Sequence, residues 1–163
     1  MRYAQINKFD VHNGEGVGVS LFVQGCHIKC NGCFNSEIWN FNGGKEWTQE
    51  SKEELFEALI NPYISRVSIL GGEPLAKPNY LAIRELMREI KNKYPDKQIW
   101  LFTGYTMEEI NQSRDLQRTI LYCDVLVDGR FEEDKKDLRL RFRGSSNQRI
   151  WRKNGIEWII EED

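Results

Sequence analysis

Three cysteines lie close together in the segment GCHIKCNGCFN, where Cys26, Cys30 and Cys33 have the spacing C-x3-C-x2-C. Thiolates at such spacing bind zinc or an iron–sulfur cluster. A structural zinc ion needs about four ligands, and His27 is a poor fourth ligand because it directly follows Cys26. A [4Fe–4S] cube takes about one cysteine per iron, so three cysteines leave one iron open. The spacing favours a cluster with an open iron, and a zinc module remains the alternative.

The rest of the composition limits the setting of this site. Cys123 leads into an apolar segment and is predicted to be a buried hydrophobic residue. The N-terminus MRYAQINKFD has no signal-peptide layout, and no apolar run is long enough to span a membrane. A net charge of -2 argues against nucleic acid as a partner. We therefore expect a cytoplasmic protein whose clustered thiols bind metal.

The hydrophobic pattern predicts strands and helices in alternation. Alternation of this kind is typical of a parallel sheet, whose ligands gather at the carboxyl ends of the strands. We expect one domain over residues 1–163, with 139–163 as a less regular, basic segment. In that segment, LRLRF and GIEWII are candidate edge strands. The expected strands are 16–25, 66–70, 98–103 and 124–128, and the expected helices are 48–60, 79–92 and one or two within 106–122.

Several short motifs follow the predicted strands and should line the same mouth as the cysteines. GGEP places Gly71, Gly72 and Glu73 after a strand, where glycines allow close backbone approach and a carboxylate can accept from an ammonium group. A plain turn is the alternative reading of GGEP. In VDGRF, Asp128 could accept from ribose hydroxyls and Arg130 could meet a carboxylate. The TGYT motif, which begins at Thr103, contributes a further loop.

Residues 135–153 concentrate eight basic side chains with one acidic side chain. One interpretation is an edge strand kept soluble by its arginines. The other is that RGSSNQR, residues 143–149, binds a protein partner through its arginines and amides. The GEGVG segment, residues 14–18, precedes a strand and is not a dinucleotide fingerprint.

Together these motifs resemble the radical S-adenosylmethionine superfamily. Within it, the chain is similar to the activating proteins of anaerobic (class III) ribonucleotide reductases. The resemblance rests on DVHNGEG, LFVQGCHIKCNGCFN, SILGGEPL, IWLFTGYT, VLVDGRF and RGSSNQR, which stand in the family's order. In the wider superfamily an aromatic residue commonly precedes the last cysteine, whereas this chain has Gly32, so Phe34 or backbone atoms must contact adenine.

The resemblance implies a function and a set of site residues. It implies that a [4Fe–4S] cluster on the three cysteines cleaves S-adenosylmethionine reductively, and that the 5′-deoxyadenosyl radical takes hydrogen from a glycine of the reductase. It also implies flavodoxin or ferredoxin as electron donor. The implied cofactor contacts are Gly32, Phe34, Gly71, Gly72, Glu73, Asp128 and Arg130. The resemblance also makes GEGVG, residues 14–18, a loop near the active-site mouth that could face the partner, and an ordinary glycine turn is the alternative.

The resemblance also implies a fold, and it leaves rivals open. A full eight-unit barrel needs about 250 residues. We therefore expect an incomplete, open parallel β/α barrel that admits the reductase's glycine loop. The rivals are an activase of another glycyl-radical enzyme of the pyruvate formate-lyase type, a radical enzyme of the carboxydeazaguanine synthase type acting on a small molecule, and a non-catalytic metal-binding module.

Overall fold

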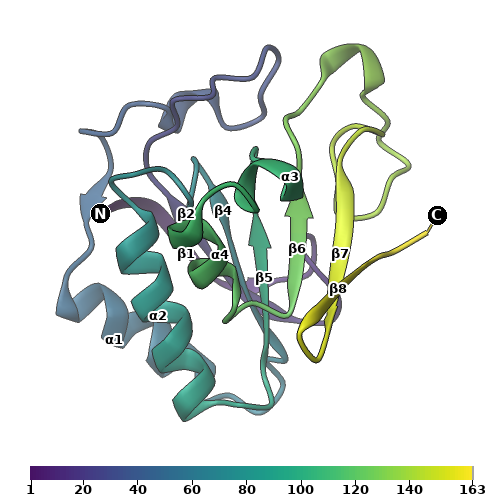
Figure 1. The fold of residues 1–163 in the computed structure, drawn as a ribbon. Coiled ribbons are helices and arrows are strands. Elements are labelled where there is room, and N and C mark those ends of the chain that lie inside the picture. The colour runs from purple at the N-terminus through teal and green to yellow at the C-terminus, as the bar shows by residue number, and fades with distance from the viewer. Residues whose placement is uncertain (163) are drawn as a thin grey trace.

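The computed structural model describes residues 1–162. Its regular elements form one sheet with helices packed against it (Figure 1). The strands are β1 (Arg2–Asp10), β2 (Gly18–Val23), β3 (Lys45–Glu46), β4 (Arg66–Gly71), β5 (Gln98–Phe102), β6 (Val125–Asp128), β7 (Arg149–Asn154) and β8 (Glu157–Ile160). The helices are α1 (Gln49–Leu59), α2 (Tyr80–Lys93), α3 (Met107–Ile110) and α4 (Arg114–Ile120), with 3-10 turns at Ser36–Ile38 and Glu133–Lys135.

The sheet is mixed, with the strand order β3-β1-β2-β4-β5-β6-β7-β8. Strands β2, β4, β5 and β6 are parallel neighbours, whereas β1, β3, β7 and β8 join antiparallel. The expected open parallel β/α barrel is therefore wrong. After β6 the chain forms a loop and returns antiparallel as β7, so no helical crossover continues the parallel pattern.

The strands and helices predicted for the parallel part of the sheet are confirmed, and the errors concern the strands towards its edges. Thr48 caps α1 by accepting from the backbone N–H of Ser51, as its position before the helix predicts. The GIEWII segment contains β8, but LRLRF forms no strand. Sequence reasoning missed β1, because RYAQINKFD carries exposed polar side chains without a clean alternation.

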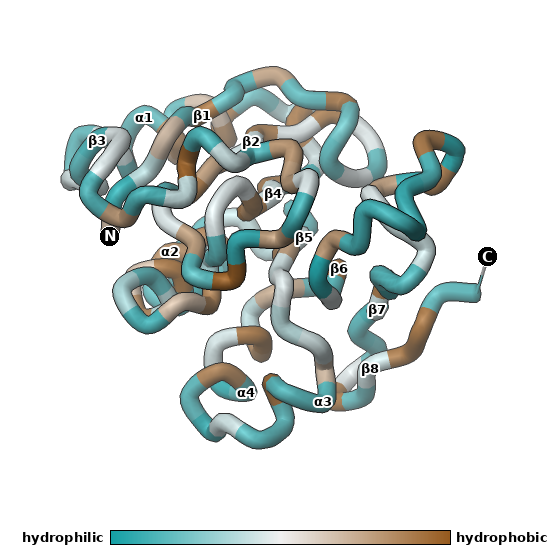
Figure 2. The backbone as a smooth tube through the Cα atoms, turned by 90° about the horizontal axis from the view of Figure 1, so that it is seen from above, coloured by the Kyte–Doolittle hydropathy of each residue, from teal (hydrophilic) through white to brown (hydrophobic). Residues whose placement is uncertain are grey.

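The two faces of the sheet are covered differently. One face packs against the helices through alternate strand residues such as Leu21, Ile69 and Leu101. Seen from above, α2, α3 and α4 lie along one side of the row of strands (Figure 2). The other face carries a smaller cluster around Trp100 and Val127, and loops cover it instead of helices. This loop-covered face leaves room for a cavity.

Two long loops rise above the carboxyl ends of the parallel strands, one after β2 and one after β6 (Figure 1). The first contains all three clustered cysteines, and the second contains residues 129–148. Among residues 1–162, none of the helices combines the length and the apolar character that crossing a membrane requires.

The β7–β8 hairpin turns at a glycine whose backbone conformation can be tested by substitution. Asn154 pairs with Glu157, so Gly155 and Ile156 form a two-residue turn, and Gly155 has φ +65°. Nothing lies within 4 Å of a Cβ added at Gly155. We expect Gly155→Ala to lower the free energy of unfolding by about 1–2 kcal/mol through backbone strain alone.

Urea unfolding measures this cost. Gly155→Asn should lose less, since asparagine tolerates positive φ. Ile156→Ala is the control, because Ile156 is 96% exposed and should change little. An alanine at 155 as stable as glycine would contradict the assigned turn.

Candidate functional site

The cysteine loop begins directly after β2 and is tied down by backbone hydrogen bonds. Gly25 N–H donates to Ile38 O and Cys26 N–H donates to Trp39 O, at 2.8 and 3.0 Å. Further along, Cys33 N–H donates to Cys30 O at 3.2 Å and closes a tight turn. The loop thus folds back on itself and brings the three cysteines to one side.

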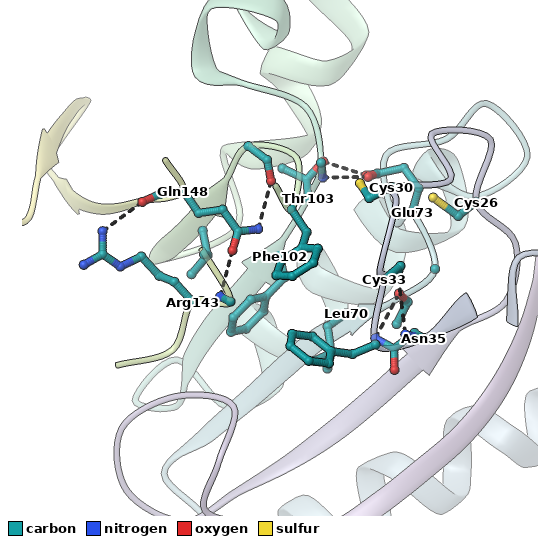
Figure 3. Close-up of a pocket in the computed structure, with 18 of the residues that line it drawn as sticks. Cys26, Cys30, Cys33, Asn35, Leu70, Glu73, Phe102, Thr103, Arg143 and Gln148 are labelled. Atoms are coloured by element: carbon teal, nitrogen blue, oxygen red, sulfur yellow. Dashed lines mark hydrogen bonds between the residues drawn. The ribbon is translucent and has the colours of Figure 1, made fainter. Parts of the chain in front are cut away.

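Cys26, Cys30 and Cys33 line one cavity of about 460 Å³, which we call the site cavity (Figure 3). Its volume is in the range of cavities that bind small molecules. Phe22, Leu70, Phe102 and Val127 form its apolar wall, and they come from the loop-covered face of the four parallel strands. The remaining lining residues are His12, Asn13, Ile28, Phe34, Asn35, Gly71, Gly72, Glu73, Thr103, Gly104, Gly129, Phe131, Leu140, Phe142, Arg143, Gly144 and Gln148.

The three thiols face the cavity without converging on one point. Within residues 1–162, no three His, Cys, Asp or Glu side chains are placed to hold a single metal ion. Tetrahedral zinc needs its ligands around one point, whereas a cubic cluster takes its thiolates at separate corners. The arrangement therefore fits a three-thiolate iron–sulfur cluster better than a mononuclear zinc ion. His27 Nε2 lies 3.0 Å from Tyr105 Oη and is thus engaged elsewhere.

The thiols of this loop differ from a redox pair. Burial raises the pKa of both Cys26 and Cys30, and hydrogen bonds from neighbouring backbone groups only partly offset this rise. Reactive thiols instead have a lowered pKa. Cys123 lies outside the site: it is buried, its thiol donates to Ile120 O at 3.2 Å, and burial raises its pKa.

Glu73 is the buried carboxylate of the site, with 1% of its surface exposed. Its Oε1 accepts from Leu75 N–H at 2.9 Å and from the Thr103 hydroxyl at 2.6 Å, and its Oε2 accepts from Gly104 N–H at 2.8 Å. Burial raises the pKa of this carboxyl, and the three hydrogen bonds oppose that rise. One carboxylate therefore ties the GGEP loop to the TGYT loop.

The glycines of GGEP allow this loop to touch the cysteine loop. Glu73 N–H donates to Gly25 O at 2.7 Å. A Cβ added to Gly72 would lie 2.3 Å from that same oxygen, so only glycine fits there. Gly71 has φ +101°, a conformation that also favours glycine. The motif is thus a contact between two loops, where the alternative reading was a plain turn.

Phe34 and Gly32 have different places in the same loop. Phe34 lines the cavity, is 56% exposed and packs against Phe131 with ring centroids 5.1 Å apart. Gly32 does not line it: its φ is +75° and an added Cβ would meet the Glu133 side chain. The structure thus places Phe34, but not Gly32, at the cavity.

Asp128 and Arg130 are not brought into the site cavity. Asp128 is fully buried, and it accepts from Met107 N–H at 2.7 Å and from Arg149. Arg130 pairs with Glu109 at 2.9 Å and donates to Gly104 O. Asp128 therefore orders α3 against β7, a role that sequence reasoning missed, and the predicted cofactor contacts of both residues stay predictions.

The RGSSNQR segment uses its amides within the chain. Gln148 Nε2 donates to Gly129 O at 3.0 Å, and its Oε1 accepts from Gly144 N–H at 2.8 Å. Arg143 donates to Gln148 O at 2.8 Å (Figure 3). Asn147 Nδ2 donates to Arg130 O at 2.7 Å. These bonds brace one wall of the cavity, and the predicted partner contact of the segment stays a prediction.

Sequence reasoning missed several lining residues. The apolar ones lie on strands that it did predict, and the side-chain alternation of a strand could have assigned them to one face. His12 and Asn13 belong to the DVHNGEG motif of the resemblance, but no periodicity assigns them to the cavity, because their contact with it depends on how the loop after β1 folds across the sheet.

Comparison with known proteins identifies similar chains. The profile of a family described as "4Fe-4S single cluster domain" matches residues 12–151. Three relatives carry the name anaerobic ribonucleoside-triphosphate reductase-activating protein. They come from Vibrio cholerae (41% identical, covering 93% of this chain and 98% of the relative), Enterobacteria phage T4 (39%, 97% and 98%) and Escherichia coli K12 (38%, 91% and 96%). The matches cover nearly the whole chain.

The Glu108–Arg149 pair beside Asp128 yields a pH-dependent prediction. Both guanidinium nitrogens NH1 and NH2 of Arg149 donate to the Glu108 carboxylate, which lowers the pKa of Glu108 from 4.5 to about 2. A lowered folded-state pKa stabilises the fold above the unfolded value, and this contribution is lost as pH falls from about 4.5 towards about 2.

We expect Glu108→Gln to reduce the free energy of unfolding at pH 7 by less than about 1 kcal/mol, since the pair is partly exposed. The difference from the parent chain should disappear as the pH approaches about 2. Urea unfolding at several pH values measures it, with Glu157→Gln on exposed β8 as the control. A deficit that stays constant down to low pH would contradict the role of the ion pair.

Proposed function

Because this chain belongs to the family of anaerobic ribonucleoside-triphosphate reductase-activating proteins, we propose that it activates an anaerobic ribonucleoside-triphosphate reductase by means of a [4Fe–4S] cluster. In the proposed reaction, S-adenosylmethionine is cleaved reductively and the 5′-deoxyadenosyl radical takes a hydrogen atom from a glycine of the reductase. Flavodoxin or ferredoxin supplies the electron. The observation that carries the proposal is the gathering of three thiols and the GGEP loop around one cavity.

The cysteine loop would hold the cluster, and its neighbours would hold S-adenosylmethionine. Cys26, Cys30 and Cys33 supply three thiolates, so one iron is left for the amino and carboxylate groups of the methionine moiety. Thiols with a raised pKa lose their protons when metal binds, so reconstitution releases protons.

Glu73 is suited to orient the amino group of S-adenosylmethionine. A carboxylate offers about four acceptor positions, and three of those on Glu73 are occupied by Leu75, Thr103 and Gly104. The second acceptor position of Oε2 is left for an ammonium donor. Since the carboxylate is fixed from three sides, it would orient that ammonium group without rearrangement.

Phe34 is the proposed contact for adenine. Its ring lies at the cavity, with Phe131 against one side and the Lys136 ammonium 5.2 Å from its centroid. Aromatic rings that are partly exposed and fixed in place are suited to stack against a base. This contact replaces the aromatic residue that is common before the last cysteine in the wider superfamily.

The cysteines provide the first test of the proposal. Anaerobic reconstitution should give about four irons per chain. Each of Cys26→Ala, Cys30→Ala and Cys33→Ala should abolish the glycyl-radical signal that forms when the reduced protein, S-adenosylmethionine and the reductase are mixed. Paramagnetic resonance and iron analysis measure both outcomes.

Cys123→Ala is the matched control, because this thiol is buried away from the cavity and should leave iron content and radical yield intact. Uptake of one zinc ion in place of a cluster would overturn the proposal. So would a protein whose cluster is reduced but which forms no radical on the reductase.

Phe34 provides a separate test of the cofactor site. We expect Phe34→Ala to raise the S-adenosylmethionine concentration needed for half-maximal cleavage by about tenfold, because base–aromatic stacking contributes about 1–3 kcal/mol. Its iron content should stay at the parent level. Tyr63→Ala, which removes an 82% exposed aromatic side chain outside the cavity, is the control. An unchanged half-saturation in Phe34→Ala would exclude the adenine contact.

A further inference from the structure

A buried ion pair lies on the loop-covered face of the sheet, below the site cavity. The Arg66 and Asp10 side chains are 0% and 1% exposed, and Arg66 NH2 lies 3.3 Å from Asp10 Oδ2. Burial alone would raise the pKa of Asp10, but hydrogen bonds from Ser20, His12 and Asn13 and the charge of Arg66 bring it below its usual value. Buried ion pairs contribute little net stability, because desolvation offsets their attraction.

The pair holds one loop, residues 11–16, which we call the floor loop. The Asp10 carboxylate accepts from the backbone N–H groups of His12 and Asn13, at 2.9 and 3.3 Å. Arg66 Nε donates to Glu15 O at 3.0 Å. The backbone of the floor loop is thus fixed from the sheet at several successive residues.

Close packing adds to these hydrogen bonds. A Cβ added to Gly14 would lie 2.7 Å from the Arg66 side chain, so the loop backbone rests directly on it. The Ser68 hydroxyl donates to Asn13 O, which fixes the loop over the middle of β4. The Glu15 carboxylate reaches Arg152 on β7 at 2.8 Å, so the loop spans the sheet from β4 to β7.

The floor loop forms one end of the site cavity. His12 and Asn13 both line it. Along β4 the cavity runs from the level of Ser68, which bonds the floor loop, past Leu70 to the GGEP loop beside the cysteines. The cysteine end is taken up by the proposed cluster and cofactor. The floor-loop end of the cavity is thus left for a polypeptide substrate.

We propose that the floor loop is the contact surface for the glycine-bearing segment of the reductase, and that Arg66 and Asp10 are positioning residues that keep it in place. The proposal rests on the proposed function, because it takes the substrate to be a polypeptide. Hydrogen abstraction requires the glycine Cα to reach the cavity, so the segment must pass between the floor loop and the wall around Phe142.

The side chains of the floor loop suit this partner. Within residues 1–162, the exposed His12 imidazole has no hydrogen bond or ion pair, although it lies at the cavity. The Asn13 amide donates to Asp10 at 3.0 Å, which leaves its carbonyl oxygen to accept. A glycine segment presents mainly backbone N–H and C=O groups, and an imidazole and an amide oxygen can bond to both. The fixed backbone of the loop lowers the cost of ordering these groups on binding.

The experiment compares binding of the reductase to reconstituted protein variants by isothermal titration calorimetry. His12→Ala should raise the dissociation constant by about tenfold or more. The thermal midpoint of unfolding should not change, because the side chain is exposed. Leu81→Ala is the control: Leu81 is 59% exposed on α2, on the opposite face of the sheet, and should bind as the parent does.

The positioning role has its own variant, the double substitution Asp10→Leu with Arg66→Met. Apolar residues of similar volume commonly replace a buried ion pair without loss of stability. Because the floor loop loses these hydrogen-bond partners, we expect faster amide hydrogen exchange in residues 11–16 of the folded variant and binding weakened at least as much as by His12→Ala.

The outcomes separate the contact surface, the positioning role and the proposed function. Parent-like affinity of His12→Ala would overturn the contact surface, and parent-like affinity and exchange in a folded double variant would overturn the positioning role. If the double variant fails to fold, Asp10→Asn replaces it, with the same expectation for exchange and affinity. A parent chain that binds the reductase but produces no glycyl radical would refute the proposed function and leave the affinity comparison valid.

Discussion

The site depends on one buried carboxylate that joins the ends of neighbouring parallel strands. Glu73 follows β4, and it bonds through its backbone to Gly25 after β2 and through its side chain to Thr103 and Gly104 after β5. A carboxylate in this position is costly to bury unless its oxygens are paired, and here three hydrogen bonds offset that cost. The same bonds fix how the cysteine loop lies against its neighbours.

The division of the sheet into two faces explains how so short a chain can contain a cavity. Helices cover only one face, and they bury the apolar residues that stabilise the fold. The other face is covered by the floor loop and by the loop after β6, which is braced by Gln148 and Asn147. Loops that are held by hydrogen bonds at their ends leave space between them. The cavity lies in that space, with the strands as its wall.

The sequence predicts the parallel part of this arrangement well, because each step follows from local rules. Hydrophobic runs mark β2, β4, β5 and β6, and parallel strands place the loops that follow them at one edge. The errors have physical causes. β1 has too many exposed polar residues to be recognised, and the antiparallel return of β7 depends on pairing with β6, which no local pattern reveals. The expected parallel barrel is wrong because the chain pairs antiparallel at β7.

The contrast between local patterns and long-range contacts also separates the site residues that the sequence could assign from those that it could not. Cys26, Cys30 and Cys33 were found from their spacing alone, since thiols near each other in sequence are near each other in space. Asp128 is predicted to contact a ligand because it ends a strand, whereas in the structure Arg149, 21 residues further along the chain, donates to its carboxylate. The arginines and amides of RGSSNQR predict a partner surface, and in the structure the Asn147 and Gln148 amides donate to backbone carbonyls of the loop after β6. A polar side chain at the end of a strand can contact a ligand or partner, or it can bond to another part of the chain. Only the long-range contacts decide between these two roles. The floor loop is the converse case, because several of its backbone groups are hydrogen-bonded to the sheet while the His12 imidazole is left at the cavity.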